Sequence, residues 1–401
     1  MNFIYTILII LILISLISWL NYRLLSRLFV PYRTKIVKYA YLCSTVVTIL
    51  VLGYSWPKHL SFGVTQQPAY YFFIYSAIAW FGGQLILLLF QPILYTVHRL
   101  IEKGRVSENK APSSLGGEMT RRRFLHHSLA VTSLVPFGIS AKSIYDAQSD
   151  LVVQRHSISL SQLPSHLKGF KICQISDSHL GSYFGLDKLD ALITLLVAEK
   201  PDLVVITGDF IDDLNLLKPA MNKLNDLHSL IPYGIYFCLG NHEYFQNIEL
   251  IRNELKKSRI TLLNNESALL VPGQEPFYLM GVDYPWSDIS RRGAVSVSKR
   301  QEYFAVANQN IPPNAFKVLI AHHPDFLIDG FAAQIPLTLA GHTHGGQVVM
   351  FGHSWLSSAS RYMRGLYREN DVYGYVSSGA GHWFPLRLNC PREISVFTLL
   401  S

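Results

Sequence analysis

Three long stretches without a charged residue constrain what this chain can fold into. They run from Phe3 to Leu20, from Tyr39 to Trp56 and from Ala69 to Val97, with 18, 18 and 29 residues. A helix that spans a bilayer needs about 20 apolar residues, and three such stretches in succession exceed what one globular core could bury. We therefore predict a three-helix transmembrane region over residues 1–100. The first stretch lacks the basic start and the small-residue cleavage site of a signal peptide, so we expect it to be retained.

Charge is distributed unevenly along the chain. Residues 1–148 carry 14 Lys or Arg and 4 Asp or Glu, a net charge of +10, whereas the remainder carries 21 basic and 23 acidic residues, a net charge of −2. The basic excess therefore lies beside the apolar stretches, which indicates a lipid bilayer as the partner and not nucleic acid. Only 15% of all residues are charged, against about 25% in soluble domains, which argues against a wholly soluble chain.

The basic residues also predict an orientation. They are numerous between the first and second stretches and after the third, whereas Lys58 alone lies between the second and third. The positive-inside rule places the first and third of these loops in the cytoplasm. The basic residues of these two loops include Arg23, Arg27, Arg33 and Lys35, and then Arg99, Lys103, Arg105, Lys110 and Arg121 to Arg123.

A weaker apolar segment follows the third loop. Residues 120–125 read TRRRFL, which resembles a twin-arginine export signal, and 18 uncharged residues run from Phe124 to Ala141. We expect this segment to cross the membrane a fourth time, which places the C-terminal domain outside the cytoplasm. The alternative is a re-entrant or interfacial helix with the domain inside. Residues 101–150 thus comprise a basic loop, this motif, the weak segment and a linker over 142–150.

The apolar segments carry no acidic or basic residue at mid-span. Transporters and channels usually need such residues or broken helices within the membrane. We therefore interpret this part of the chain as an anchor.

Residues 151–401 predict a layered α/β domain. Short apolar runs alternate with amphipathic helical patterns, which is typical of strands and helices in such a fold. The strands are expected at 151–159, 170–176, 203–207, 234–239, 277–282, 316–321 and 336–340, and the helices at about 185–199, 215–230, 247–258 and 298–308.

Five of these strands end in His, Asp or Asn. Because ligands of open α/β sheets bind at the carboxyl ends of the strands, we expect these side chains to converge on one edge. His342 and His344 would point to the same side of an extended strand end, because they are alternate residues. The five blocks are Asp177-Ser-His179, Gly208-Asp209, Gly240-Asn241-His242-Glu243, His322-His323 and Gly341-His342-Thr-His344.

The donor atoms in these blocks indicate a metal centre. Oxygen and imidazole donors without a thiolate favour Mn²⁺, Fe, Zn²⁺ or Mg²⁺ over a structural cysteine–zinc site. Seven donors exceed one tetrahedral centre, so we expect two divalent ions. Two ions about 3.5–4 Å apart can activate water and clamp both oxygens of a phosphoryl transfer. The candidate donors are Asp177, His179, Asp209, Asn241, His342, His344 and one histidine of the His322-His323 pair.

The order of the blocks resembles the pattern of the calcineurin-like metallophosphoesterase superfamily, which is D-x-H, G-D-x-x-D, G-N-H-E/D, a single His and G-H-x-H. With Asp212 completing the second block, all five are intact within 151–401. The run KICQISDSHLG at 171–181 and the tail after Gly365 resemble a bacterial membrane-associated or exported subgroup, which includes enzymes that cleave UDP-2,3-diacylglucosamine. The resemblance implies a metallophosphoesterase β-sandwich flanked by helices, here preceded by a helical anchor of three or four transmembrane helices.

The resemblance also implies a role for each predicted ligand. Asp209 would bridge the two metal ions, and His323 is the alternative to His322. Asp177, His179 and His344 would bind one ion, and Asn241, His322 and His342 would bind the other.

Four further residues receive roles from the same resemblance. His242 would be the catalytic residue that faces the leaving oxygen, where an imidazole can act as a general acid. Asp212 and Glu243 would orient histidine side chains, with a solvated helix start as the alternative for Asp212. Arg387 would contact phosphate or form a structural salt bridge.

Together these patterns predict a membrane-anchored binuclear phosphoesterase that hydrolyses a phosphomonoester, phosphodiester or diphosphate bond by attack of a metal-activated hydroxide. Tethering to the membrane favours a phosphorylated, amphiphilic or lipid-linked substrate. The first alternative is a UDP-2,3-diacylglucosamine diphosphatase of lipid A synthesis, which requires the domain in the cytoplasm. The alternative from another class is a non-catalytic receptor or scaffold on a degenerate phosphoesterase fold, although no ligand is lost. The oligomeric state and the identity of the metal stay open.

Overall fold

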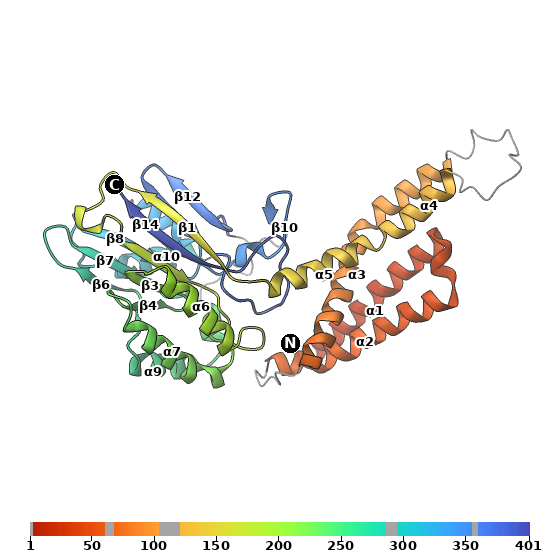
Figure 1. The fold of residues 1–401 in the computed structure, drawn as a ribbon, viewed down its shortest axis with the longest axis horizontal. Helices are drawn as coiled ribbons and strands as arrows, with labels where there is room; N and C mark the ends of the chain where they lie inside the picture. Colours follow the sequence, from red (N-terminus) through yellow and green to blue (C-terminus); the bar gives the residue numbers. More distant parts are fainter. Residues whose placement is uncertain (1–2, 61–67, 104–120, 286–294, 355–359) are drawn as a thin grey trace, which may run out of the picture. The chain divides into compact units, whose positions relative to one another are not determined.

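The structure is a computed structural model, and it describes residues 3–60, 68–103, 121–285, 295–354 and 360–401 (Figure 1). The chain divides into two compact units, Met1–Tyr145 and Asp146–Ser401. The basic loop is predicted over 103–120, and residues 104–120 of it, including the first residue of the TRRRFL motif, lie outside the described residues.

The N-terminal unit is helical, and four of its segments are long and apolar enough to cross a membrane: Leu8–Leu28, Lys35–Tyr54, Ala69–Lys103 and Arg123–Gln148. The predicted linker over 142–150 is wrong in part, because the last helix continues to Gln148 without a glycine or proline to end it. The helices are α1 (Phe3–Leu28), α2 (Lys35–Leu60), α3 (Pro68–Lys103), α4 (Arg121–Thr132) and α5 (Val135–Gln148), with the short η1 (Val30–Arg33) after α1.

Polar side chains lie between these helices, and large apolar side chains face outward. Ile12 and Leu89 are 64% and 69% exposed. Inside the unit, the buried Gln84 of α3 accepts hydrogen bonds through Oε1 from Asn21 Nδ2 of α1 at 2.7 Å and from the Tyr41 hydroxyl of α2 at 2.6 Å. Lipid tails are as apolar as the side chains, so the hydrophobic effect does not drive helices together in a bilayer. Polar contacts such as these therefore help to hold the helices together.

The C-terminal unit is built on two six-stranded sheets. Strands β2, β3 and β4 of the first sheet run parallel, as do β7, β8, β9 and β13 of the second. The first sheet has the order β1 (Val152–Ser159), β14 (Glu393–Leu400), β2 (Lys171–Ile175), β3 (Leu203–Thr207), β4 (Ile235–Cys238) and β5 (Thr261–Leu262). The second has the order β12 (Gly365–Glu369), β13 (Val372–Val376), β9 (Leu337–Ala340), β8 (Phe316–Ile320), β7 (Phe277–Gly281) and β6 (Glu266–Val271).

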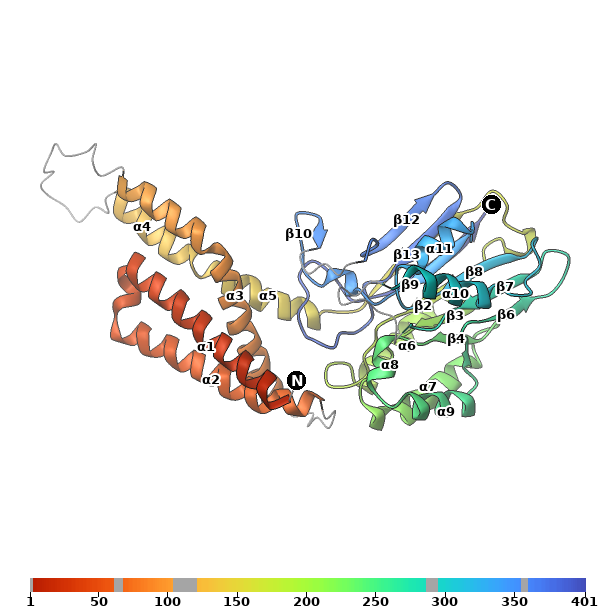
Figure 2. The same cartoon turned by 180° about the vertical axis from the view of Figure 1, so that it is seen from behind.

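The two sheets pack face to face around one apolar core. Val205 and Phe397 of the first sheet and Leu279 and Val318 of the second belong to this core and are fully buried. Helices α6 (Leu186–Ala198), α7 (Leu217–His228) and α9 (Ile248–Lys257) cover the outer face of the first sheet, and α10 (Val297–Ala307) and α11 (Phe326–Ala332) cover that of the second (Figures 1 and 2). The predicted layered α/β sandwich flanked by helices is therefore confirmed.

A buried glutamine joins the two sheets at the carboxyl ends of their strands. Gln174 of β2 donates through Nε2 to Thr207 Oγ1, at the end of β3, at 2.8 Å and to the carbonyl oxygen of Ala340, at the end of β9, at 2.9 Å. The polar blocks that follow β2, β3 and β9 therefore start from neighbouring points.

Candidate metal centre

The first group of predicted ligands comes from the loops after β2 and β9. His179 Nε2 lies 3.0 Å from His344 Nε2, and His344 Nε2 lies 3.5 Å from Asp177 Oδ1. All three side chains are buried. We call Asp177, His179 and His344 the first ligand group.

The second ligand group comprises Asn241, His322 and His342. Asn241 is the first residue of α8 (Asn241–Phe245), His322 follows β8 and His342 follows β9. Asn241 Oδ1 lies 2.9 Å from His342 Nδ1 and 3.1 Å from His322 Nε2, and these two nitrogens are 3.2 Å apart.

Asp209 lies between the two ligand groups, at the end of β3. Its Oδ2 is 3.7 Å from His179 Nε2 in the first group and 3.2 Å from His322 Nε2 in the second. Four ligands at 2.0–2.1 Å around a zinc ion stand about 3.3 Å from one another. The spacing of the donors in both groups therefore suits a metal ion, and the structure brings all seven predicted ligands together.

The backbone of this centre is strained. Non-glycine residues seldom adopt positive φ, and each such residue costs about 1–3 kcal/mol, which the surrounding structure must offset. Five of the seven predicted ligands have it: Asp177 (52°), His179 (50°), Asp209 (51°), His342 (74°) and His344 (49°).

The two histidines after β9 do not extend this strand, contrary to our expectation. The strand ends at Ala340, and His344 begins the short η6 (His344–Gly346). Because both histidines have left-handed backbone, His342 turns toward the second ligand group and His344 toward the first.

Two glycines allow the close approach of the strand ends. Gly208 has a φ of 80°, and a Cβ there would lie 2.6 Å from His322 Nδ1. A Cβ at Gly341 would collide with the Asp177 carboxylate. Larger residues at these positions would displace predicted ligands.

Hydrogen bonds determine which nitrogens face the centre. His322 Nδ1 donates to the carbonyl oxygen of Thr207 at 2.7 Å, and His179 Nδ1 donates to Asp212 Oδ2 at 3.1 Å. The lone pair of Nε2 in both rings is then available to a metal ion. Asp212 is 6% exposed and accepts this bond from His179, so its contacts favour the orienting role over a solvated helix start.

Glu243 acts on the backbone and not on a histidine ring, which differs from our expectation. Its carboxylate accepts N–H bonds from Gly240 at 2.7 Å, from Asp209 at 2.9 Å and from Phe210 at 2.8 Å. This fully buried side chain therefore holds the strained turn that presents Asp209.

His242 is held at two points beside Asp209. Its Nδ1 donates to Asp212 Oδ1 at 2.6 Å, and its backbone N–H donates to Asp209 Oδ1 at 2.8 Å. The side chain is 17% exposed. Burial lowers the pKa of His242, but the carboxylates of Asp209 and Asp212 outweigh this effect and raise the pKa to about 9.

Neighbouring imidazoles hold two carboxylates of the centre in the charged form. Burial raises the pKa of Asp209, yet the imidazoles of His322, His242 and His179 outweigh it and hold the pKa well below its ordinary value. Burial likewise raises the pKa of Asp212, but His179 and His242 lower it to about 2. These carboxylates therefore attract positive charge.

Arg387 and His323 occupy structural positions. Arg387 is fully buried, and its Nη2 donates to the carbonyl oxygens of Ser378 at 2.8 Å and Gly381 at 2.6 Å. The same nitrogen lies 3.3 Å from His344 Nδ1, which favours a structural role over contact with phosphate. His323 Nδ1 accepts from the backbone N–H of Asp325 at 3.2 Å, so the contacts favour His322 as the ligand.

One residue beside the centre was missed in the sequence. The buried ring of Tyr284 lies 5.7 Å from that of His322 and 5.8 Å from that of His342, measured between centroids. Tyr284 and the preceding Asp283 follow β7, so the rule that polar residues follow strand ends could have found them.

The fold and this centre are compatible with a metal-dependent phosphoester hydrolase. Residues 170–354 match the family model for calcineurin-like phosphoesterases. The chain thus carries a domain of the calcineurin-like phosphoesterase family, and the predicted resemblance is confirmed at the level of the family.

Relatives from bacteria and from a mammal share this domain. Metallophosphoesterase Cj0846 of Campylobacter jejuni is 34% identical, over 59% of this chain and 61% of the relative. Phosphodiesterase YaeI of Escherichia coli is 28% identical, over 70% of this chain and 100% of the relative. A "transmembrane protein with metallophosphoesterase domain" of Bos taurus is 27% identical, over 88% of this chain and 79% of the relative. The chain thus spans less than two thirds of the Campylobacter protein.

Proposed function

We propose that the chain is a membrane-anchored phosphoesterase that holds two divalent cations and hydrolyses a phosphomonoester, phosphodiester or diphosphate bond. The position of Asp209 carries this proposal, because one carboxylate oxygen faces His179 of the first ligand group and His322 of the second. The first ligand group would hold one cation, the second would hold the other, and Asp209 would bridge them.

The charges of the centre support two divalent cations. Asp177, Asp209, Asp212 and Glu243 are all buried, and Arg387 is the buried guanidinium nearby. Burying carboxylates is costly unless positive charge balances them, and divalent cations would supply such charge. When bound, such a pair lowers the pKa of water and neutralises charge on phosphoryl oxygens.

His242 is the proposed catalytic residue. Asp212 fixes its Nδ1, so its Nε2 is the nitrogen left to exchange a proton with the leaving oxygen. Its partial exposure distinguishes it from the buried His179, His322 and His344, and it would allow contact with a substrate.

The proposed substrate is amphiphilic. The four apolar segments would keep the domain at a membrane surface, where lipid-linked phosphoesters are concentrated. The name of the Escherichia coli relative, a phosphodiesterase, supports a phosphodiester as the bond that is broken.

We further propose that the catalytic domain lies outside the cytoplasm. Four crossings with the first and third loops inside return the chain to the outer side after Gln148. A reporter fused after Ser401 tests this: alkaline phosphatase should be active there and green fluorescent protein dark. The opposite pattern would contradict the proposed side and favour a nucleotide-linked lipid as substrate.

Hydrolysis by the full-length chain in detergent tests the proposed reaction. With Mn²⁺, we expect cleavage of bis-p-nitrophenyl phosphate. Phospholipid and UDP-2,3-diacylglucosamine are tested beside it as the two candidate natural substrates. His242→Ala should lower kcat by about 10²–10⁴-fold while the metal content stays unchanged. His166→Ala, at an exposed histidine of the same unit, is the matched control. Equal activity of the two variants would contradict the role of His242.

A further inference from the structure

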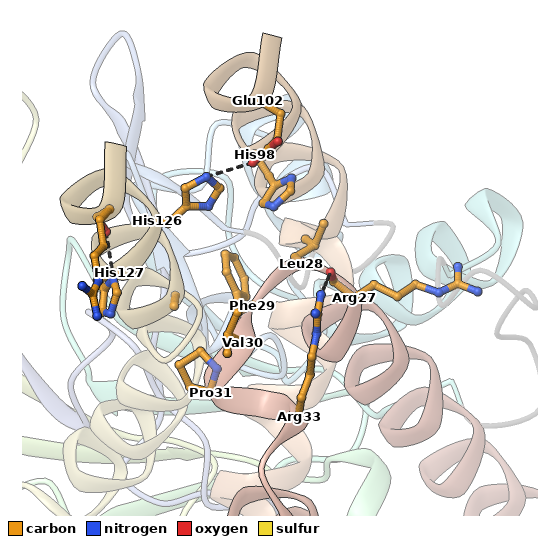
Figure 3. Close-up of a pocket in the computed structure, with 12 residues that line it drawn as sticks. Arg27, Leu28, Phe29, Val30, Pro31, Arg33, His98, Glu102, His126 and His127 are labelled. Carbon is orange, nitrogen blue, oxygen red and sulfur yellow. Dashed lines mark hydrogen bonds and ion pairs between the residues drawn. The ribbon is translucent and has the colours of Figure 1, made fainter. Parts of the chain in front are cut away.

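The helical unit contains a second cluster of metal-binding side chains. His98 and Glu102 lie four residues apart on α3, so they share one face of that helix, and His126 lies on α4. Each of the three offers a ligand atom, and these atoms lie within 4.8 Å of one another. Figure 3 shows the three side chains pointing toward one another from the two helices.

The geometry of this cluster suits one metal ion. His126 Nε2 lies 3.1 Å from Glu102 Oε1, close to the separation of about 3.3 Å between ligands of a tetrahedral zinc ion. The rings of His98 and His126 meet edge to face, with centroids 5.1 Å apart. His98 Nδ1 is buried and has no hydrogen-bond partner among the residues that the structure describes.

A cavity of about 680 Å³ adjoins these side chains. Phe29, Pro31 and Ala130 contribute apolar wall to it, and the rings of Phe29 and His98 pack edge to face. An apolar surround strengthens the bond between a metal ion and its ligands, and the cavity leaves room for a water molecule or another ligand in a fourth position.

Of the three arginines that line the cavity, Arg27 and Arg33 do not form an anion site. Arg33 donates to the carbonyl oxygens of Ser26 and Arg27, both at 2.8 Å, so its guanidinium caps the end of α1. The Arg27 side chain points away from His98 and Glu102 (Figure 3). The groups that converge are therefore the imidazoles and the carboxylate, which bind a cation.

We propose that His98, Glu102 and His126 bind a divalent transition ion of the Zn²⁺ class and thereby join α3 to α4. Two imidazoles and one carboxylate are borderline donors, which Zn²⁺ and Co²⁺ accept. The proposed site is separate in sequence from the catalytic centre and does not depend on the proposed phosphoesterase reaction.

Metal stoichiometry of the full-length chain in detergent tests the site. After metal is stripped and Co²⁺ restored, His98→Ala and His126→Ala should bind about one molar equivalent less than the wild type. His127→Ala, at the exposed neighbour of His126, should match the wild type, and all three variants should hydrolyse bis-p-nitrophenyl phosphate at the wild-type rate. Equal stoichiometry in His98→Ala and His127→Ala would overturn the proposal and leave His126 and Glu102 as an ion pair.

A spectroscopic variant decides the case in which an alanine variant fails to fold. His126→Cys places a thiolate in the proposed ligand position, and its Co²⁺ complex should gain a thiolate-to-cobalt charge-transfer band that His127→Cys lacks. Absence of that band would overturn the proposal. If the phosphoesterase assignment fails instead, bis-p-nitrophenyl phosphate is not cleaved, but the difference between the His126 and His127 variants persists.

Discussion

The helical unit and the α/β unit both bury polar side chains, but they pair them differently. In the helical unit, Gln84 Oε1 accepts from Asn21 and Tyr41, so a donor meets an acceptor. In the α/β unit, the Nε2 atoms of His179 and His344 face one another at 3.0 Å. Two ring nitrogens at this distance share either a proton or a cation, whereas the contact of Gln84 needs neither.

The helical unit and the α/β unit also differ in backbone strain. The described non-glycine residues with positive φ all lie after Tyr145, and five of them are predicted ligands. The polar contacts of Asn21, Tyr41 and Gln84 instead join regular helices. For these residues, polar burial between regular helices serves packing, whereas polar burial on a strained backbone marks the candidate catalytic centre.

Removing the shared carboxylate should break the catalytic centre and leave the rest of the chain intact. Asp209→Asn keeps the shape of the side chain but removes the charge between the two ligand groups, so we expect loss of bound metal and a fall in kcat of roughly 10³-fold. Metal analysis and hydrolysis of bis-p-nitrophenyl phosphate measure both. Asp226→Asn, at an exposed carboxylate of α7, is the control. Full metal content together with full activity in Asp209→Asn would contradict the bridging role.

A methyl group at Gly341 should disturb one ligand group. The added Cβ would meet the Asp177 carboxylate, and a misplacement near 1 Å costs about 10²-fold in rate. Gly138→Ala is the control, because a Cβ there meets nothing within 4 Å. We expect kcat to fall in Gly341→Ala and not in Gly138→Ala, and equal rates would show that the approach of Gly341 to Asp177 is unimportant.

Neutralising Glu243 should loosen the centre without removing a ligand. In the wild type, the carboxylate accepts hydrogen bonds from backbone N–H groups. In Glu243→Gln, the amide NH₂ would face some of these donors and could not accept from them, so the free energy of unfolding should fall by about 1–3 kcal/mol. Metal affinity should fall by about 10–100-fold, as for other residues that support ligands. Glu249→Gln, at a side chain that is 73% exposed, should change neither quantity. Denaturation and metal titration of the two variants separate them.

Much of this fold could be predicted because apolar runs mark its central strands. The runs at 170–176 and 203–207 correspond to β2 and β3. Strand β14 was missed, although it lies between β1 and β2. Its position depends on pairing the end of the chain with segments more than 200 residues earlier, and no local pattern reports such pairing.

The candidate site was predictable in composition but not in geometry. The polar residues after strand ends include all seven predicted ligands that the structure brings together, because strands of one sheet deliver their ends to one edge. The left-handed backbone of His342 and His344 was not predictable, since tertiary contacts impose it against the local preference of histidine. The support of Asp209 by Glu243 was missed for a similar reason, because a sequence does not show which backbone N–H groups a carboxylate will contact.

The smallest effect on stability is expected for a polar contact between helices of the helical unit. Gln84→Leu removes the acceptor shared by Asn21 and Tyr41, and polar contacts between membrane helices contribute about 0.6 kcal/mol each, with a maximum of about 1.7. The helices should therefore unfold in detergent at a slightly lower temperature, while hydrolysis of bis-p-nitrophenyl phosphate stays unchanged. Thr96→Leu is the control, because the exposed Thr96 hydroxyl donates to the Pro92 carbonyl of its own helix. A loss of metal or activity in Gln84→Leu would mean that this polar contact serves the catalytic centre, and the division between structural and functional polar burial would then be wrong for this protein.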